Sequence, residues 1–182
     1  MGFKEWSFVC DALGAGRQSI IIRKGGIAEG KGGFQWQASE FLLFPTHYHE
    51  QSQSTDWTPS ATALEDEKTP DQVILRLAAR IEGTASVPDM ETALALAPHH
   101  VWKEETIRQR FGYGESTGLS VAVLRVFRLP EPRTIPMQPK FGGCRSWVDL
   151  PERPLDGLTP VLTDAEHALR VETLRTLFPK AD

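Results

Sequence analysis

Basic and imidazole side chains follow two short apolar segments in the first third of the chain. The pair Arg23-Lys24 comes directly after the apolar residues 20–22, and His47 and His49 follow the apolar residues 41–44. Short apolar runs bounded by Gly or Pro are typical of strands buried on both faces. An antiparallel return through the intervening glycines would bring these cations and imidazoles to neighbouring ends of one sheet. The pattern predicts a polar site there, but it names no reaction.

An anion-binding pocket is the chemistry that these residue types suit best. Arginine binds phosphate and carboxylate groups in bidentate fashion, and tryptophan rings offer a stacking face for a base. In the competing interpretation the tryptophans belong to the core and the cations are solvated where strands end; the residue types do not decide between the two. The candidates for the pocket are Arg23, Lys24, His49, His100 and Arg110, with the rings of Trp36, Trp102 and Trp147.

Metal binding is a further hypothesis. His47 and His49 would share one face of a strand and could chelate an ion, with more imidazole at His99-His100. No third ligand is fixed by local spacing. Acid-x-Lys triplets of the kind that some nucleases use occur at residues 29–31 and 66–68. Both triplets fall in predicted loops, and chance accounts for such triplets in a chain of this composition.

Cysteine chemistry is the remaining alternative. Cys144 could act as a nucleophile with His49 or His100 as its base, and Gly142-Gly143 would let a substrate approach closely. The same residues also make an ordinary sharp bend into a strand. Cys10 lies on an apolar stripe and is predicted to be a small core residue. Because the chain has no CxxC motif, its two cysteines indicate neither a disulfide framework nor a zinc knuckle.

Composition limits the classes of protein that remain. A chain of 182 residues fits one domain with a proper core, since a domain of this size buries roughly 70% of its unfolded surface. The net charge of −4 and the absence of a basic run argue against nucleic-acid binding by bulk electrostatics. No apolar segment reaches the roughly 18 residues that a membrane span needs, and no signal-peptide core begins the sequence. We therefore expect a cytoplasmic location without membrane contact.

The elements that position these side chains are predicted from apolar spacing and from capping residues. Apolar residues three and four apart predict an N-terminal helix over residues 3–13, which Gly14 and Gly16 end. Phe34 and Trp36 should begin the return strand, and Pro45 should end it because proline has no N–H to donate. Lys24 comes where its strand leaves the core, so its charge is expected near solvent.

The rest of the chain alternates strands with helices. Residues 50–70 form a polar connection that is long for a compact domain; we expect a mobile loop, either disordered or a lid, with Trp57 docked back. The last helix should open with a capping box, Thr163 with Glu166. The other predicted elements are a half-exposed antiparallel strand at 73–82, a central strand at 119–129, a glycine bend and strand at 141–148, and helices at 88–96 and 103–111.

Several motifs occur in a characteristic order: RKGGI, then FLLFPT with a histidine three residues beyond its threonine, then HHVW, RF and GCRSWV. In this order they resemble an uncharacterised bacterial family, domain of unknown function 1802, from Lys4 to about Leu150. The resemblance carries no assigned activity. His47 falls outside the family pattern, which weakens a metal site that needs it. The residues that the resemblance places in the pattern are Arg23, Lys24, His49, His100, Arg110, Cys144 and Trp147.

We therefore expect a single α+β domain over residues 1–182, with a mixed, mainly antiparallel sheet flanked by helices. The leading function hypothesis is a binding or catalytic module for a phosphate-bearing ligand, such as a nucleotide or a nucleic acid end. A non-catalytic protein-interaction or structural module is the alternative, and a metal-dependent hydrolase built on His47 and His49 is the third. The expected partner is an anionic small molecule or nucleic acid; the sequence indicates no cofactor and no oligomeric state.

Overall fold

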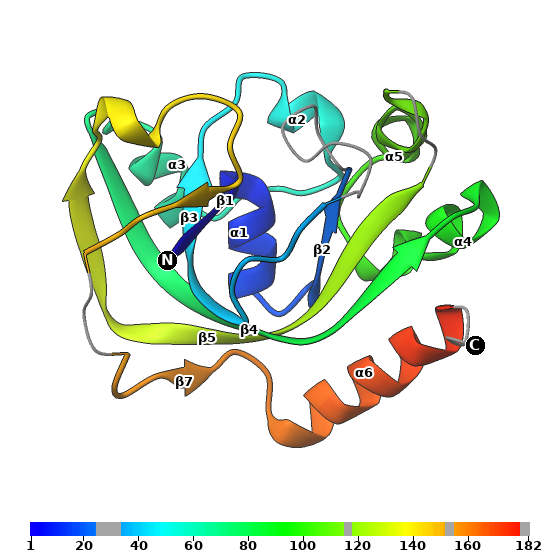
Figure 1. Ribbon diagram of the computed structural model, residues 1–182. Helices are drawn as coiled ribbons and strands as arrows, with labels where there is room; N and C mark the ends of the chain where they lie inside the picture. Colours follow the sequence, from blue (N-terminus) through cyan, green and yellow to red (C-terminus); the bar gives the residue numbers. More distant parts are fainter. Residues whose placement is uncertain (25–33, 115–117, 152–154, 179–182) are drawn as a thin grey trace.

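A single mixed sheet organises the described part of the chain. The structure is a computed structural model, and it describes residues 1–24, 34–114, 118–151 and 155–178 (Figure 1). The strand order is β2-β5-β4-β3-β1-β6, with β7 paired to β5. Only β1 and β3 run parallel within this described sheet; the other pairs are antiparallel. The strands are β1 (Gly2–Trp6), β2 (Ile20–Arg23), β3 (Glu40–Thr46), β4 (Gln72–Val87), β5 (Leu119–Pro136), β6 (Trp147–Val148) and β7 (Thr159–Pro160).

Helices cover both faces of this curved sheet. Helix α1 lies inside the curve, and α6 lies along the outer side of β4 and β5 (Figure 1). These positions confirm the predicted α+β class with a mixed, mainly antiparallel sheet in one domain. A lipid bilayer could not be crossed by any helix among the residues that the structure describes. The helices are α1 (Ser7–Gly14), α2 (Gln51–Ser54), α3 (Ala61–Asp66), α4 (Met90–Ala95), α5 (Glu104–Gly112) and α6 (Asp164–Leu177), with 3₁₀ turns η2 (Ala97–His99) and η3 (Pro139–Phe141).

Most elements with a strong local signal form where the sequence predicts them. Strand β4 alternates buried and more exposed residues from Val73 onward, and β5 is buried on both faces over residues 121–126. Asp89 caps α4 by accepting from the backbone N–H of Thr92. The capping box of α6 is present in full, with Thr163 and Glu166 bonded to each other's backbone. The spacing of apolar residues and the presence of capping residues were sufficient to predict these elements.

The N-terminal prediction was partly wrong. Residues 2–6 form a strand, and the helix occupies only residues 7–14, although it ends at Gly14 as predicted. Strand β1 pairs with β3 on one side and with β6 on the other. These two ladders satisfy the backbone of β1, and such pairing with distant segments outweighs a helical apolar stripe that is short.

The predicted pairing of the first two apolar segments was also wrong. Strand β2 pairs with β5, whereas β3 lies between β4 and β1, so two strands separate them. Phe34 and Trp36 precede β3 and belong to no strand. Pro45 lies inside β3 rather than ending it, in register with Glu5. Proline is tolerated there because β4 pairs with β3 only at residues 40–42, which leaves no ladder on that side.

The polar connection at 50–70 contains more regular structure than predicted. Helices α2 and α3 form within it, and the Ser60 hydroxyl caps α3 by accepting from the N–H of Ala63. Trp57 does dock back: its indole Nε1 donates to Asp11 of α1 at 2.8 Å. The polar residues therefore serve as caps and short helices, and the mobility of this segment stays a prediction.

Candidate functional site

Charged and aromatic side chains meet at one end of β1 and β2. We call the group formed by Glu5, Arg23, Arg110, Trp6 and Trp102 the arginine cluster. The Glu5 carboxylate is fully buried, and its Oε2 atom lies 3.1 Å from Nη1 of Arg23, in an ion pair without hydrogen-bond geometry. Arg23 also donates through Nη2 to the carbonyl of Lys4. A buried carboxylate beside two guanidinium groups is costly to desolvate unless the charges compensate one another.

Arg110 is held by aromatic rings rather than by hydrogen bonds. Its guanidinium carbon lies 3.7 Å from the centroid of the Trp102 ring and 5.2 Å from that of Trp6. Among the described residues no hydrogen-bond acceptor pairs with this guanidinium. Burial lowers the pKa of Arg110 to about 10, with Glu5 opposing the shift and Arg23 adding to it. Arg110 therefore remains a cation at neutral pH, with its N–H donors available.

Lys24 and His100 flank the arginine cluster but have structural contacts of their own. The Lys24 ammonium donates to the carbonyl of Phe111 at 2.9 Å and to that of Gly118 at 3.1 Å, so this partly exposed charge is held by two backbone carbonyls. His100 is 3% exposed, and its Nδ1 accepts from the backbone N–H of Trp102. Burial, and then the charge of Arg17, lower the pKa of His100 to about 4, so the ring is neutral at pH 7.

Three other candidates are not part of the arginine cluster. His49 is exposed in the turn after β3. Trp147 is buried, and its Nε1 donates to the carbonyl of Gln35. Cys144 is exposed, and no hydrogen bond within the described residues joins it to His49 or His100. The carbonyl of Gly143, the residue before Cys144, accepts from the Lys4 ammonium. This bond holds the glycine bend against β1. These contacts provide no base for a cysteine nucleophile.

The metal hypothesis gains no support from the geometry. His47 Nδ1 lies 3.3 Å from the Glu67 carboxylate. Among the described residues no group of three His, Cys, Asp or Glu side chains could hold a metal ion. Of the two acid-x-Lys triplets, residues 29–31 lie outside the described part of the chain. In the triplet 66–68 both acids are bonded to other side chains, so it has a structural use.

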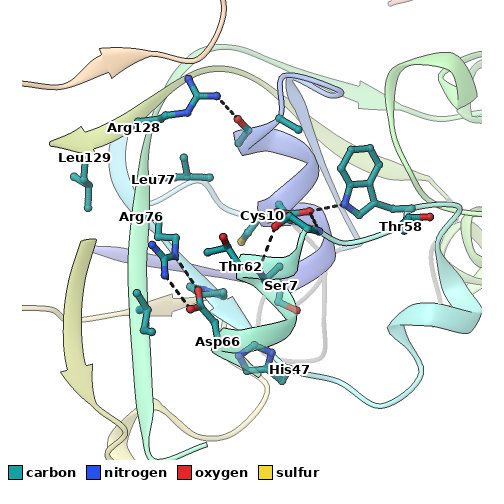
Figure 2. Close-up of a pocket in the computed structure, with 18 residues that line it drawn as sticks. Ser7, Cys10, His47, Thr58, Thr62, Asp66, Arg76, Leu77, Arg128 and Leu129 are labelled. Atoms are coloured by element: carbon teal, nitrogen blue, oxygen red, sulfur yellow. Dashed lines mark hydrogen bonds and ion pairs between the residues drawn. The ribbon is translucent and has the colours of Figure 1, made fainter. Parts of the chain in front are cut away.

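A cavity of about 450 Å³ lies beside α1 (Figure 2). Its walls come from α1, from Trp57 through α3, and from β4 and β5. Arg76 and Asp66 form a bidentate pair in the wall, with both N···O distances 2.9 Å. Of the metal and nuclease candidates from the sequence, His47 and Asp66 line this cavity, as does Cys10, and no residue of the arginine cluster is in its lining. It is therefore distinct from the arginine cluster.

Sequence reasoning missed several of these residues. Glu5 and Trp6 were assigned to a helix, which hid the pairing of β1 that brings them to Arg23 and Arg110. Arg76 lies in the half-exposed strand predicted at 73–82, and the sequence indicated no partner for it. No local signal connects it to Asp66, because the two meet only when α3 folds back over β4. A lone acid such as Glu5 in an apolar segment is the one signal that was present.

The geometry defines an α+β domain with a cationic, aromatic-lined cluster at its strand ends. The chain belongs to the family described as "Domain of unknown function (DUF1802)", whose model matches residues 2–173. This match confirms the family resemblance of the motifs. No curated protein matches the chain.

Two solved structures are similar in fold. The ASCH protein of Zymomonas mobilis is 13% identical, with a TM-score of 0.44, and the match covers 95% of this chain and 93% of that one. A serine-to-alanine mutant of the Zymomonas protein is also 13% identical, with a TM-score of 0.45 and coverage of 95% and 94%. Superpositions as loose as these carry no conclusion about ligand or activity.

Proposed function

We propose that this protein binds a phosphate-bearing ligand, a nucleotide or the end of a nucleic acid, through Arg110. The observation that carries the proposal is the unpaired guanidinium of Arg110. Its donors are fixed in direction by the two tryptophan rings and find no acceptor among the described residues. Guanidinium groups bind phosphate through two parallel N–H···O bonds. An anion at this position would satisfy donors that the described part of the chain leaves without partners.

The local charge favours an anion. Arg23 and Arg110 stand beside one carboxylate, Glu5, and Lys24 lies at the end of the helix that carries Arg110. Burial lowers the pKa of Arg110 and outweighs the attraction of Glu5, so an added negative charge would stabilise the charged guanidinium. A phosphate group would supply that charge, and the interaction would be stronger than at a fully exposed site because Arg110 is partly buried.

Aromatic residues beside Arg110 could hold the rest of the ligand. The Trp6 ring lies 5.1 Å from the ring of Tyr48, and Tyr48 is 47% exposed. Stacking on an aromatic ring contributes roughly 1–3 kcal/mol per base and tolerates any base. Trp102 is less available, because one of its faces is covered by Arg110. The expected order is therefore phosphate on Arg110 and base or sugar toward Tyr48.

A titration of the purified protein tests this proposal. Pyrophosphate, nucleoside mono- and triphosphates and short 5′-phosphorylated oligonucleotides are titrated by calorimetry into wild type, Arg110→Ala and Arg110→Lys. At least one ligand should bind wild type, and Arg110→Ala should weaken it by tenfold or more, as expected for a charge-assisted bond of roughly 1.5–3 kcal/mol. Arg110→Lys should also bind more weakly, because lysine cannot bind in bidentate fashion.

Arg108 provides the matched control on the same helix. It is half exposed and pairs with Glu104 one turn away. Arg108→Ala should leave the affinity unchanged. Two outcomes would remove the proposal in favour of a non-catalytic interaction module: no anion in the panel binds wild type, or Arg110→Ala binds every hit as tightly as wild type does.

A further inference from the structure

We infer that the cavity beside α1 is a second binding site, for a small carboxylic acid with an apolar body. This site lies apart from Arg110 and does not depend on the function proposed above. Its volume of about 450 Å³ falls in the range of roughly 300–1,000 Å³ that is usual for small-molecule sites. Its walls are mostly apolar, with Pro45, Ile74, Leu77 and Leu129 from the sheet and Ala63 from α3. Such walls favour a ligand with a hydrocarbon or aromatic body.

The carboxylates in the wall are already satisfied. Asp11 accepts from Trp57 Nε1 at 2.8 Å, from the Ser60 backbone N–H at 2.9 Å and from the Ser60 hydroxyl at 2.6 Å. Asp66 accepts from Arg76 on both oxygens. Arg76 therefore neutralises Asp66, and the three bonds from neutral donors occupy the Asp11 carboxylate on both of its oxygens. Both acids are therefore engaged within the wall, and the free hydrogen-bonding groups of the cavity lie elsewhere.

Donors remain on the sheet side of the cavity. Arg128 donates through Nη2 to the carbonyl of Gly14 at 2.7 Å, and it has no acidic partner among the described residues. Arg76 uses Nε and Nη2 for Asp66, and its Nη1 makes no hydrogen bond within that same described part. In Figure 2 Leu77 lies between these two arginines. The cavity therefore offers hydrogen-bond donors, and a ligand should supply an acceptor to them. Because Arg128 has no acidic partner among the described residues, a negatively charged acceptor is favoured.

An irregularity in the sheet places these side chains. The register of β4 and β5 passes from Leu75↔Arg133 to Leu77↔Arg128, so Arg76 alone stands opposite residues 129–132. Bulges of this kind re-aim side chains and occur next to functional sites more often than elsewhere. Here Arg76 and Leu77, which are consecutive, both line the cavity. A regular strand would direct them to opposite faces.

The ligand is thus expected to place its carboxylate at Arg128 and its apolar body along Leu77 toward Cys10. Octanoate, phenylacetate and indole-3-acetate are suitable probes, each compared with the alcohol of the same skeleton. Calorimetry or ligand-observed NMR should detect binding of at least one acid to wild type. The matching alcohol should bind about tenfold or more weakly, since it lacks the charge that strengthens the hydrogen bond.

Two variants connect any binding to this cavity. Thr62 is exposed on α3, and its side chain is directed into the cavity (Figure 2), so Thr62→Trp should fill the space and abolish binding of the acid. Arg128→Gln should weaken binding of the acid about tenfold and leave binding of the alcohol unchanged. Circular dichroism checks that both variants fold. If Thr62→Trp does not fold, the effect of Arg128→Gln on acid binding tests the site by itself.

Three results would overturn the inference. They are no binding of any acid to wild type, equal binding of acid and alcohol, and acid binding that is unchanged in Arg128→Gln. Arg110→Ala is the control that separates the two sites. It should bind the acids as wild type does, whether or not it binds phosphate ligands, so failure of one proposal is distinguishable from failure of the other.

Discussion

The guanidinium carbon of Arg110 lies 3.7 Å from the centroid of the Trp102 ring, while the backbone N–H of Trp102 donates to His100. This relationship connects the buried turn before α5 to the cation on α5 itself. A cation over a tryptophan contributes roughly 2 kcal/mol or more when both groups are desolvated. The ring therefore holds a charge in place without occupying its N–H donors, which is the property that a preformed anion site requires.

Glu5→Gln should destabilise the protein. The amide oxygen can keep the bond that Glu5 accepts from the backbone N–H of Trp6, so the substitution removes mainly the charge. It leaves Arg23 and Arg110 without a counter-charge, and breaking a buried pair costs about 3–5 kcal/mol. We expect the free energy of unfolding, measured with urea, to fall by about 3 kcal/mol. The loss should be at the lower end of the range because Arg23 keeps its hydrogen bond to the Lys4 carbonyl. In the exposed pair with Lys68, Glu65→Gln should cost less than about 1 kcal/mol; similar losses in both variants would contradict this account.

Lys24→Ala tests whether this lysine is a structural residue. Its ammonium bonds the carbonyl of Phe111 at the end of α5 and that of Gly118 directly before β5. Hydrogen bonds to charged groups contribute about 1.5–3 kcal/mol, and partial exposure places the expected loss near the lower value. Chemical denaturation measures it. Lys68→Ala, at an exposed position, should change the free energy of unfolding by less than about 0.5 kcal/mol; an equally small effect at Lys24 would show that the two bonds contribute nothing.

His100 should make folding depend on pH. Burial lowers its pKa from 6.5 to about 4, so the folded state binds fewer protons than the unfolded state between these two values. Stability therefore falls as the pH drops below 6.5, and this loss ends near pH 4. Between pH 7 and pH 5 the contribution of His100 is about 2 kcal/mol. Urea titrations at the two pH values should show a smaller change in His100→Asn; parallel losses in the two proteins would rule out this role for His100.

The two cysteines should differ in reactivity. Burial, and then the charge of Glu5, raise the pKa of the Cys10 thiol well above its usual value, whereas Cys144 is exposed. Thiolates are the reactive species, so Cys144 should react quickly with a disulfide reagent and Cys10 only after unfolding. The absorbance of the thiol product that the reagent releases measures the fast and the slow phase of the reaction. Cys144→Ser should remove the fast phase and Cys10→Ser the slow one. Two fast thiols in the native protein would contradict the burial of Cys10.

Local sequence signals were sufficient for part of the fold. The alternation in residues 73–82, the acids and arginines at opposite ends of α5, and the capping box of α6 each act within a few residues. Their hydrogen bonds and side-chain spacing depend on the segment itself. The motif order also identified the family. Arg23 and Arg110 could be selected from the sequence because their residue type suits anions, whatever their surroundings.

Only the tertiary structure decided which side chains meet. Residues 2–6 became a strand because β3 and β6 supply hydrogen-bond partners from far along the chain. Strand β2 joined β5 rather than β3 for the same reason: pairing is a competition among all strands, and no single segment records its outcome. Trp6 and Arg110 became neighbours because α5 packs at the end of β1, and Asp66 and Arg76 because α3 folds back over β4. The sequence therefore specified the types of side chain in each site, and the packing of distant strands specified their partners.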